Sequence, residues 1–173
     1  NDTDHDLHGP GILWTPGQMS LHPGQFGEYA VLRWTAPRAG SCTVQARFAG
    51  IAEKATTDVH VLHQGKAVFD GAINVGGQGN EASCKKTILV NSGDTIDFAV
   101  GWGNGSYGGD TTAVALTVHL GETVYVAADF AKGTDVSQAW SCGYFAAKKI
   151  DAATFKPFRF LQETTREFGA LCN

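Results

Sequence analysis

Apolar and polar residues alternate along short stretches of this chain, and glycine, proline, asparagine or aspartate separates each stretch from the next. In residues 28–35, every second residue is apolar, and this side carries Ala30, Leu32 and Trp34. The opposite side is mixed and includes Arg33. A period of two residues is typical of a β-strand with one buried face.

The same alternation predicts further strands at 41–49, 57–63, 67–73, 83–90, 95–100 and 111–118. Gln64-Gly65-Lys66 is a turn sequence that would join two of them as a hairpin. Many short strands at this spacing, separated by turn residues, predict an all-β fold. We therefore expect an antiparallel β-sandwich of the jelly-roll type.

Three regions follow from this pattern: a polar lead-in at 1–11, a β-sandwich core at 12–121 and a C-terminal segment at 122–173. The last region is expected to form strands at 124–130 and 138–145, one helical turn capped by Asp151, an extended stretch at 155–160 and a short helix at 162–168. It is too apolar for a linker and must bury its aromatic side chains against something. These include Tyr125, Phe130, Trp140, Tyr144, Phe145, Phe155 and Phe158.

Composition narrows the classes of protein. The chain has 173 residues, of which 22 are glycine and 17% are charged, and its net charge is −4. Nucleic-acid binding requires a basic footprint, so this charge argues against it. No apolar run approaches the ~20 residues of a membrane span. A glycine-rich, weakly charged all-β chain favours an extracellular or cell-surface location.

The four cysteines, Cys42, Cys84, Cys142 and Cys172, lie far apart and form no C-x-x-C pair. This spacing disfavours zinc and redox motifs and leaves disulfides or buried thiols. Two of the cysteines lie in predicted strands of the core and two in the C-terminal segment. We predict the disulfides Cys42–Cys84 and Cys142–Cys172. The alternative is four small buried hydrophobic residues.

A glycine-rich loop at 101–110 contains a G-x-G-x-x-G match from Gly103 to Gly108. Dinucleotide binding would need a helix after this motif, whereas a predicted strand follows. The loop also carries Trp102, Asn104, Tyr107 and Asp110. Aromatic faces stack on apolar sugar faces, and amide and carboxylate groups bind hydroxyls. These four residues are the candidate ligand-binding set, and a plain glycine-rich connection is the alternative.

The sequence shows no catalytic constellation, and we predict that the chain is not an enzyme. Asp58 and His60 share a strand face, but no motif ties a serine or cysteine nucleophile to them. A pair of hydrolytic carboxylates could still arise in space among Glu28, Asp97 and Asp110.

No cofactor and no specific metal site is predicted. A structural calcium ion held by loop oxygens would suit the fold, but no ligand spacing identifies one. His5 and His8 could meet in a loop near Asp4 and Asp6, although a solvated lead-in is the simpler interpretation. Two N-x-[ST] sequons start at Asn1 and Asn104 and are candidate glycosylation sites.

Three stretches, LHPGQFGEYAVLRWTAPRAG, TTDVHVLHQGKAVFDGAI and KKTILVNSGDTIDFAVGWGNGSYGGDTT, follow one another along the core. Together they resemble a secreted jelly-roll module of planctomycete and verrucomicrobial extracellular proteins, which is similar to galactose-binding-like carbohydrate-binding modules. The stretch ADFAKGTDVSQAWSCGYFA, residues 128–146, resembles the beginning of that module. Because it comes last here, the chain resembles the module in a rotated frame.

The resemblance and the residues leave two functions open. In the first, the chain is an extracellular structural module whose partners are copies of itself. Its C-terminal segment would then join subunits head to tail into a fibre or surface layer, by strand donation or as a tandem repeat. In the second, it is a carbohydrate-binding module that contacts extracellular polysaccharide through the loop from Trp102 to Asp110. For the C-terminal segment, folding back onto its own body is the alternative to donation.

Overall fold

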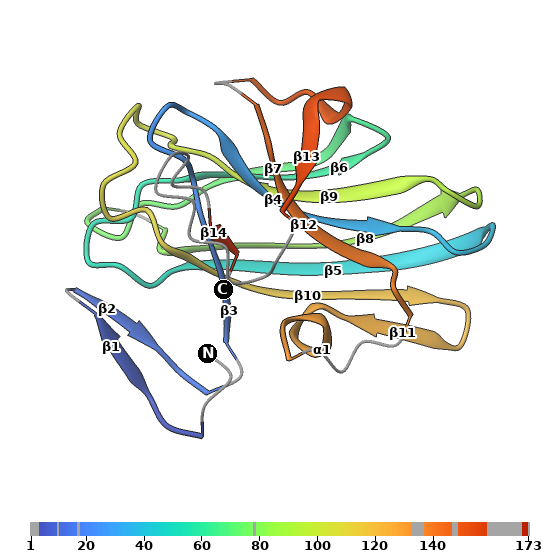
Figure 1. Ribbon diagram of the computed structural model, residues 1–173, viewed down its shortest axis with the longest axis horizontal. Helices are drawn as coiled ribbons and strands as arrows, with labels where there is room; N and C mark the ends of the chain where they lie inside the picture. Colours follow the sequence, from blue (N-terminus) through green and yellow to red (C-terminus); the bar gives the residue numbers. More distant parts are fainter. Residues whose placement is uncertain are drawn as a thin grey trace.

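In the computed structural model, two six-stranded antiparallel sheets form a β-sandwich (Figure 1). The structure describes residues 4–9, 11–16, 18–77, 79–132, 137–146, 149–158 and 171–172. Sheet I consists, in order, of β14 (Leu171–Cys172), β3 (Met19–His22), β10 (Thr112–Leu120), β5 (Gly40–Gly50) and β8 (Glu81–Val90), with β11 (Thr123–Val126) beside β10. Sheet II consists of β13 (Phe155–Pro157), β12 (Trp140–Phe145), β4 (Tyr29–Thr35), β9 (Thr95–Val100), β6 (Asp58–His63) and β7 (Lys66–Ala72).

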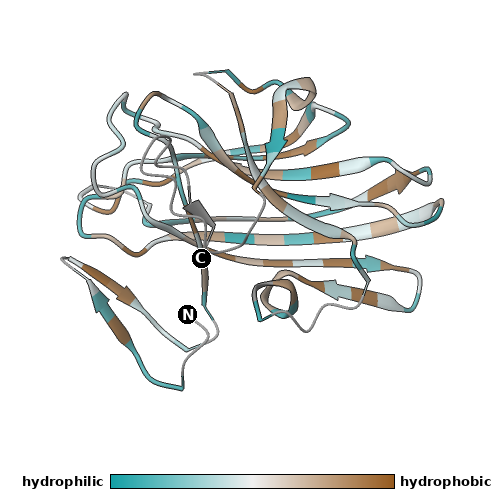
Figure 2. Ribbon diagram, in the orientation of Figure 1, coloured by the Kyte–Doolittle hydropathy of each residue, from teal (hydrophilic) through white to brown (hydrophobic). Residues whose placement is uncertain are grey.

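This architecture confirms the predicted all-β jelly-roll sandwich. Hydrophobic and hydrophilic residues alternate along the strands (Figure 2), and the hydrophobic side chains of the two sheets meet in one core. Trp34, Phe48 and Phe98 are its largest fully buried side chains. Among the described residues, no helix is long and apolar enough to cross a membrane.

Two details of the predicted strands are wrong. The stretch 124–130 was expected to be one strand, but β11 ends at Val126 and the short helix α1 (Ala127–Ala131) follows. Its alanine-rich sequence AADFA has a high helix propensity. The strand β3 was not predicted, because its four residues do not alternate and three of them are buried. The predicted helix at 162–168 lies outside the described residues.

The N-terminal stretch also contains strand structure where a polar lead-in was expected. β1 (Leu7–Gly9) and β2 (Ile12–Trp14) form a separate antiparallel hairpin. A single bridge between Ile12 and Ala52 and a hydrogen bond from Trp14 Nε1 to Ser20 Oγ connect it to the sandwich.

The C-terminal segment completes the sandwich of its own chain. β12 pairs with β4 along its whole length, and β14 pairs with β3. Its aromatic side chains are used inside the chain: Trp140, Phe145 and Tyr125 are buried, Tyr144 stacks on Phe158 at 5.6 Å, and Phe130 packs against the core. The intramolecular pairing therefore lends no support to strand donation between subunits.

The predicted Cys42–Cys84 disulfide is wrong, because both residues are free thiols. Their strands β5 and β8 are neighbours, but Cys42 pairs with Ile88, whereas Cys84 pairs with Ala46. This four-residue offset spans about 13 Å of strand, well beyond the Cα separation of about 7 Å that a disulfide tolerates. Cys142 is disulfide-bonded. The side chain of Cys172, its predicted partner, lies outside the described side chains, so that pairing stays a prediction.

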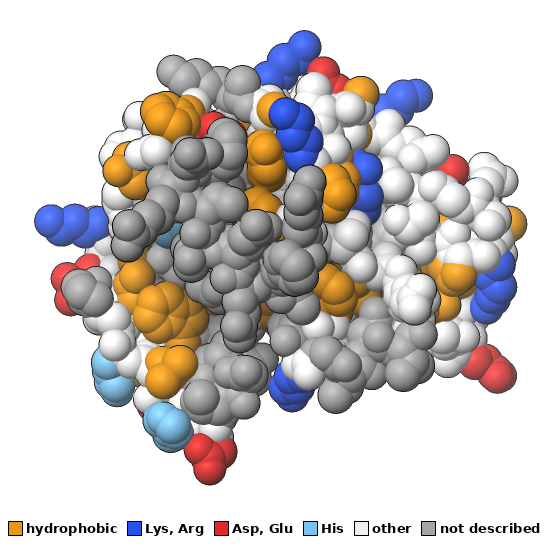
Figure 3. Space-filling model, in the orientation of Figure 1, with side chains coloured by type: hydrophobic (Ala, Val, Ile, Leu, Met, Phe, Trp, Pro, Cys, Tyr) orange, Lys and Arg blue, Asp and Glu red, His pale blue; other side chains and the backbone are white. Residues whose placement is uncertain are grey.

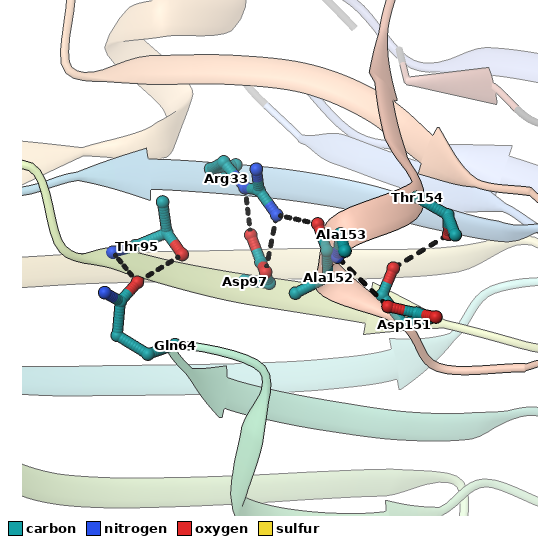
Figure 4. Close-up of polar contacts among 8 residues, drawn as sticks. All are labelled: Arg33, Gln64, Thr95, Asp97, Asp151, Ala152, Ala153 and Thr154. Carbon is teal, nitrogen blue, oxygen red and sulfur yellow. Dashed lines mark hydrogen bonds and ion pairs between the residues drawn. The ribbon is translucent and has the colours of Figure 1, made fainter.

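Residues 149–158, which we term the strap, pack on part of the outer face of sheet II and include its edge strand β13. The strap contains the 3-10 turn η1 (Ala152–Thr154), where the predicted cap Asp151 accepts a hydrogen bond from Ala153 N at 3.1 Å. Arg33 fastens it: the guanidinium binds Asp97 at 2.6 and 2.9 Å and donates to Ala152 O at 3.2 Å (Figure 4). The same guanidinium lies 3.9 Å from the centre of the Phe155 ring.

Candidate functional site

Three aromatic rings, one from the end of β3 and two from the loop 101–110, meet at one end of the sandwich. We term this group the aromatic corner: His22, Trp102 and Tyr107. The ring centres of Trp102 and Tyr107 are 6.4 Å apart, and those of His22 and Tyr107 are 6.3 Å apart. Tyr107 is 43% exposed. Phe26, on the loop that Trp102 contacts, is 58% exposed. This end of the molecule therefore presents aromatic surface to solvent.

Backbone contacts fix the loop 101–110 against its neighbours. Trp102 Nε1 donates to the carbonyl of Gly24, which ties the loop to the β3–β4 connection. Gly103 N donates to Asp58 Oδ1 at 2.8 Å. Gly103 has a φ of +62°, and a Cβ there would lie 2.5 Å from the carbonyl oxygen of Thr56. Only glycine fits this backbone conformation so close to another strand.

Asp110 closes the loop from inside the protein. Its side chain is fully buried, and Oδ1 accepts from Thr56 N at 2.8 Å. The other carboxylate oxygen, Oδ2, is buried without a hydrogen-bond partner. Burial, reinforced by the nearby charge of Asp58, raises the pKa of Asp110 to about 6. Among the four predicted ligand residues, Asp110 is thus placed to shape the loop and not to touch a ligand.

Asn104, by contrast, is exposed on the loop. Its Oδ1 accepts from Ser106 N at 2.9 Å, which forms a local turn and leaves the side-chain N–H groups as donors. Asn104 also starts the glycosylation sequon of the loop. Asn1, which starts the other sequon, lies outside the described residues.

A polar network stands behind the loop on sheet II. Tyr29 donates its hydroxyl hydrogen to Asp58 Oδ2 at 2.6 Å. His60 Nε2 lies 2.8 Å from the same oxygen, and His60 Nδ1 lies 2.6 Å from Asp70 Oδ1. Asp58 and His60 therefore lie on the same face of β6, as predicted, and on this face Asp58 contacts the loop 101–110.

The strap covers part of the outer face of sheet II. Val31, Leu62, Ala99 and Phe145 are buried there beneath strap residues that include Phe155. The outer face of sheet I carries a shallow hollow of about 180 Å³ near Ala49, Ala113 and Ala115. Its lining has no aromatic side chain.

Exposed apolar side chains also occur on the β1–β2 hairpin. Leu7 is 39% and Leu13 is 41% exposed, and Figure 3 shows hydrophobic side chains beside histidines at this edge of the molecule. His5 contacts Asp4 at 2.9 Å on the exposed lead-in. Within the described part of the chain, no three His, Cys, Asp or Glu side chains gather as metal ligands.

The three carboxylates considered for hydrolysis do not share a site. Glu28 accepts from Phe26 N at 3.0 Å, Asp97 binds Arg33, and Asp110 binds Thr56. All three are buried. Each therefore serves a separate structural contact.

Sequence reasoning missed His22 and Phe26 as members or neighbours of the aromatic surface. Both residues belong to the turn sequence His22-Pro23-Gly24-Gln25-Phe26. Its Gly24, which contacts Trp102, lies 78 positions before it in the sequence. The sequence offers one signal, a phenylalanine within a turn sequence. Turns lie on the surface, where a large apolar side chain is unusual.

No protein-family model matches the chain, and no curated protein matches it. The solved structures similar to it include two carbohydrate-binding modules. One is a family 35 carbohydrate binding module from Clostridium thermocellum, 18% identical, with a TM-score of 0.36 over 65% of this chain and 80% of that chain. Another is CBM35 from Paenibacillus barcinonensis, 17% identical, with a TM-score of 0.34 over the same shares of the two chains.

Proposed function

We propose that this chain is a non-catalytic carbohydrate-binding module that contacts extracellular polysaccharide through the aromatic corner. The observation that carries the proposal is the exposed ring of Tyr107, held beside Trp102 on a loop that is fixed at three points. Fixed aromatic rings present apolar area at little entropic cost, and sugar rings have apolar faces of matching size.

Polar groups next to the rings complete the chemistry. The amide of Asn104 supplies N–H donors on the same loop, and His22 supplies an imidazole that contacts the edge of Tyr107. Donors and acceptors of this kind orient a sugar by its hydroxyls while the rings provide the contact area. Phe26 extends the exposed aromatic area on the neighbouring loop.

An extracellular or cell-surface location fits this function. The disulfide bond of Cys142 is the supporting observation, because disulfides persist mainly in oxidising compartments. The partner we propose is polysaccharide, and the assembly of copies into a fibre is not part of the proposal.

Affinity electrophoresis tests the function. The parent protein is run in native gels with and without soluble xylan, mixed-linkage β-glucan, galactomannan, arabinogalactan or polygalacturonate, and is also applied to a glycan array. We expect at least one polysaccharide to retard the parent. Tyr107→Ala should lose this retardation with an unchanged melting temperature, because the side chain is exposed and its loop is fixed elsewhere.

Leu89→Ala is the matched control, because Leu89 is 78% exposed on β8, a strand far along sheet I. It should bind as the parent does. A parent that binds nothing in the gels or on the array contradicts the proposal. So does a Tyr107→Ala variant that binds unchanged.

A further inference from the structure

The loop 101–110 packs on the side chain of Asp58. Its Oδ1 accepts from Gly103 N at 2.8 Å. A Cβ on Gly101 would lie 2.4 Å from Asp58 Oδ1, so the loop backbone packs directly on this carboxylate. Asp58 is thus the side chain that sets where the residue after Trp102 lies.

Asp58 faces three hydrogen-bond donors at once. Oδ1 takes the Gly103 N–H, and Oδ2 takes the Tyr29 hydroxyl at 2.6 Å and His60 Nε2 at 2.8 Å. A protonated carboxyl would place a hydrogen among these donors and lose an acceptor site. The ionised form is the one that accepts from all three donors.

His60 is built to maintain that form. Its two ring nitrogens lie 2.8 Å from Asp58 Oδ2 and 2.6 Å from Asp70 Oδ1. Both nitrogens donate only in the imidazolium, because a neutral ring would turn a lone pair toward one carboxylate. The side chain of His60 is 13% exposed, whereas that of Asp70 is 64% exposed. The charge of His60 is therefore directed mainly at Asp58.

Among the described charged and titratable groups around Asp58, His60 is the one that can carry a positive charge. From β4 comes the Tyr29 hydroxyl, from β7 comes Asp70, and from the loop comes the carboxyl of Asp110. The residue opposite His60 on β9 is Ala99, which carries no charge. Without His60, Asp58 would face only neutral donors and two further carboxyl groups.

We propose that Asp58 positions the aromatic loop of the carbohydrate site and that the imidazolium of His60 keeps Asp58 ionised, so that the site holds its shape in acid. This inference rests on the proposed function only for the kind of ligand that the loop binds. How Asp58 and His60 hold the loop does not depend on that function.

The pKa shifts agree in direction. Burial alone would raise the pKa of Asp58, but hydrogen bonds from His60, Tyr29 and Gly103 hold it below its ordinary value. Burial alone would lower the pKa of His60, but Asp58 and Asp70 raise it above its ordinary value of 6.5. The His60 contribution is thus complete below pH 6.5 and is lost as the pH rises through the raised value. The Asp58 contribution is complete above its ordinary value of 3.8 and is lost only in stronger acid.

Amide hydrogen exchange on the full chain tests the positioning. Protection factors for residues 101–110 are measured at pH 4 and pH 6 and corrected for the intrinsic exchange rate at each pH. The parent should show the same protection at both. Asp58→Ala should lower it about tenfold or more at both, because a charge-assisted hydrogen bond is removed. His60→Gln should lower it at pH 4 relative to pH 6.

Two further variants keep the test decisive if Asp58→Ala does not fold. Asp58→Asn keeps an oxygen that can accept from Gly103, so protection should persist at pH 6 and no longer fall when the pH drops below 4. Asp70→Asn removes only the exposed contact of His60 and should behave like the parent at pH 4. Unchanged protection in Asp58→Ala overturns the positioning role. A His60→Gln profile identical to that of the parent overturns the role of the imidazolium.

Polysaccharide binding separates this inference from the proposed function. The probe is the polysaccharide that retards the parent most in the gels described above. Loss of both protection and retardation in Asp58→Ala supports both proposals. Lost protection with unchanged retardation overturns the placement of the binding site, while the positioning role stands. A parent that binds no polysaccharide but shows the predicted exchange pattern overturns the proposed function alone.

Discussion

At the scale of single residues, buried polar groups define the candidate site more than the exposed ones do. Asp110 and Asp58 both hold the loop 101–110. Burial has the largest effect on the pKa of Asp110, whereas for Asp58 the hydrogen bonds together outweigh burial. Asp110 has one oxygen without a partner, and its pKa is raised to about 6. Asp58 has donors on both oxygens, and its pKa is lowered. Two carboxyl groups of one loop anchor therefore respond to acid in opposite ways.

Asp110 predicts a pH dependence of stability. Its folded pKa of about 6 exceeds its ordinary value of 3.8, so its favourable contribution is complete below pH 3.8 and is lost as the pH rises through 6. The loss amounts to roughly 2–3 kcal/mol. Asp110→Asn does not titrate, so its free energy of unfolding should rise relative to that of the parent by this amount between pH 4 and pH 7.

Urea unfolding at pH 4, 5, 6 and 7 measures this difference. Glu122→Gln, which removes an exposed carboxyl, is the control and should track the parent. A difference between Asp110→Asn and the parent that stays constant over this range would show that Asp110 ionises normally.

At the scale of elements, the strap decides which surfaces of the sandwich are available. It lies over Val31, Leu62, Ala99 and Phe145 and is fastened by Arg33 (Figure 4). This part of sheet II is therefore closed to a ligand by the chain itself.

Breaking the Arg33–Asp97 pair should unfasten the strap. Arg33→Met leaves Asp97, which is fully buried, without its charge partner. We expect a loss of about 3–5 kcal/mol in the free energy of unfolding. Amides of 149–158 should exchange faster than in the parent. The double variant Arg33→Met/Asp97→Leu should recover most of the loss, and a failure to recover would place the energy in the Phe155 contact instead.

At the scale of the whole molecule, the chain closes on itself. β14 pairs with β3, so the C-terminal end lies beside the start of sheet I. The rotated frame itself stays a prediction.

Closure predicts a monomer. With β12 and β14 paired inside the chain, neither strand is left for donation to a second copy. Sedimentation velocity from micromolar to near-millimolar concentration should give one species at the monomer mass. Filaments in electron micrographs of the purified chain would contradict this and restore the assembly hypothesis.

Thiol counting tests the cysteines across the whole chain. Cys42 and Cys84 are free, with Cys42 buried, so little reaction is expected in the native protein. After unfolding without a reductant, two thiols should react if Cys142 is bonded to Cys172. Reduction should release two more and destabilise the fold by ~3–4 kcal/mol, since that bond closes a long loop. Four reactive thiols without a reductant would refute the pairing.

The amino-acid sequence by itself determined most strands of the core, because a period of two residues is a local property. Trp34 and its alternating neighbours marked β4, and Gln64-Gly65 marked the hairpin between β6 and β7, where both residues have positive φ. The aromatic loop was also visible, because Trp102, Asn104 and Tyr107 lie within six positions of one another.

Tertiary structure alone decided the rest, because it depends on contacts between distant residues. Register separated Cys42 from Cys84, although both lie on neighbouring strands. Gly103 meets Asp58 across 45 positions of sequence, and no local pattern encodes that contact. The burial of Asp110 likewise depends on packing against Thr56, 54 positions away. Side-chain chemistry is written in the sequence, but exposure, pairing and charge state arise only when the sheets pack.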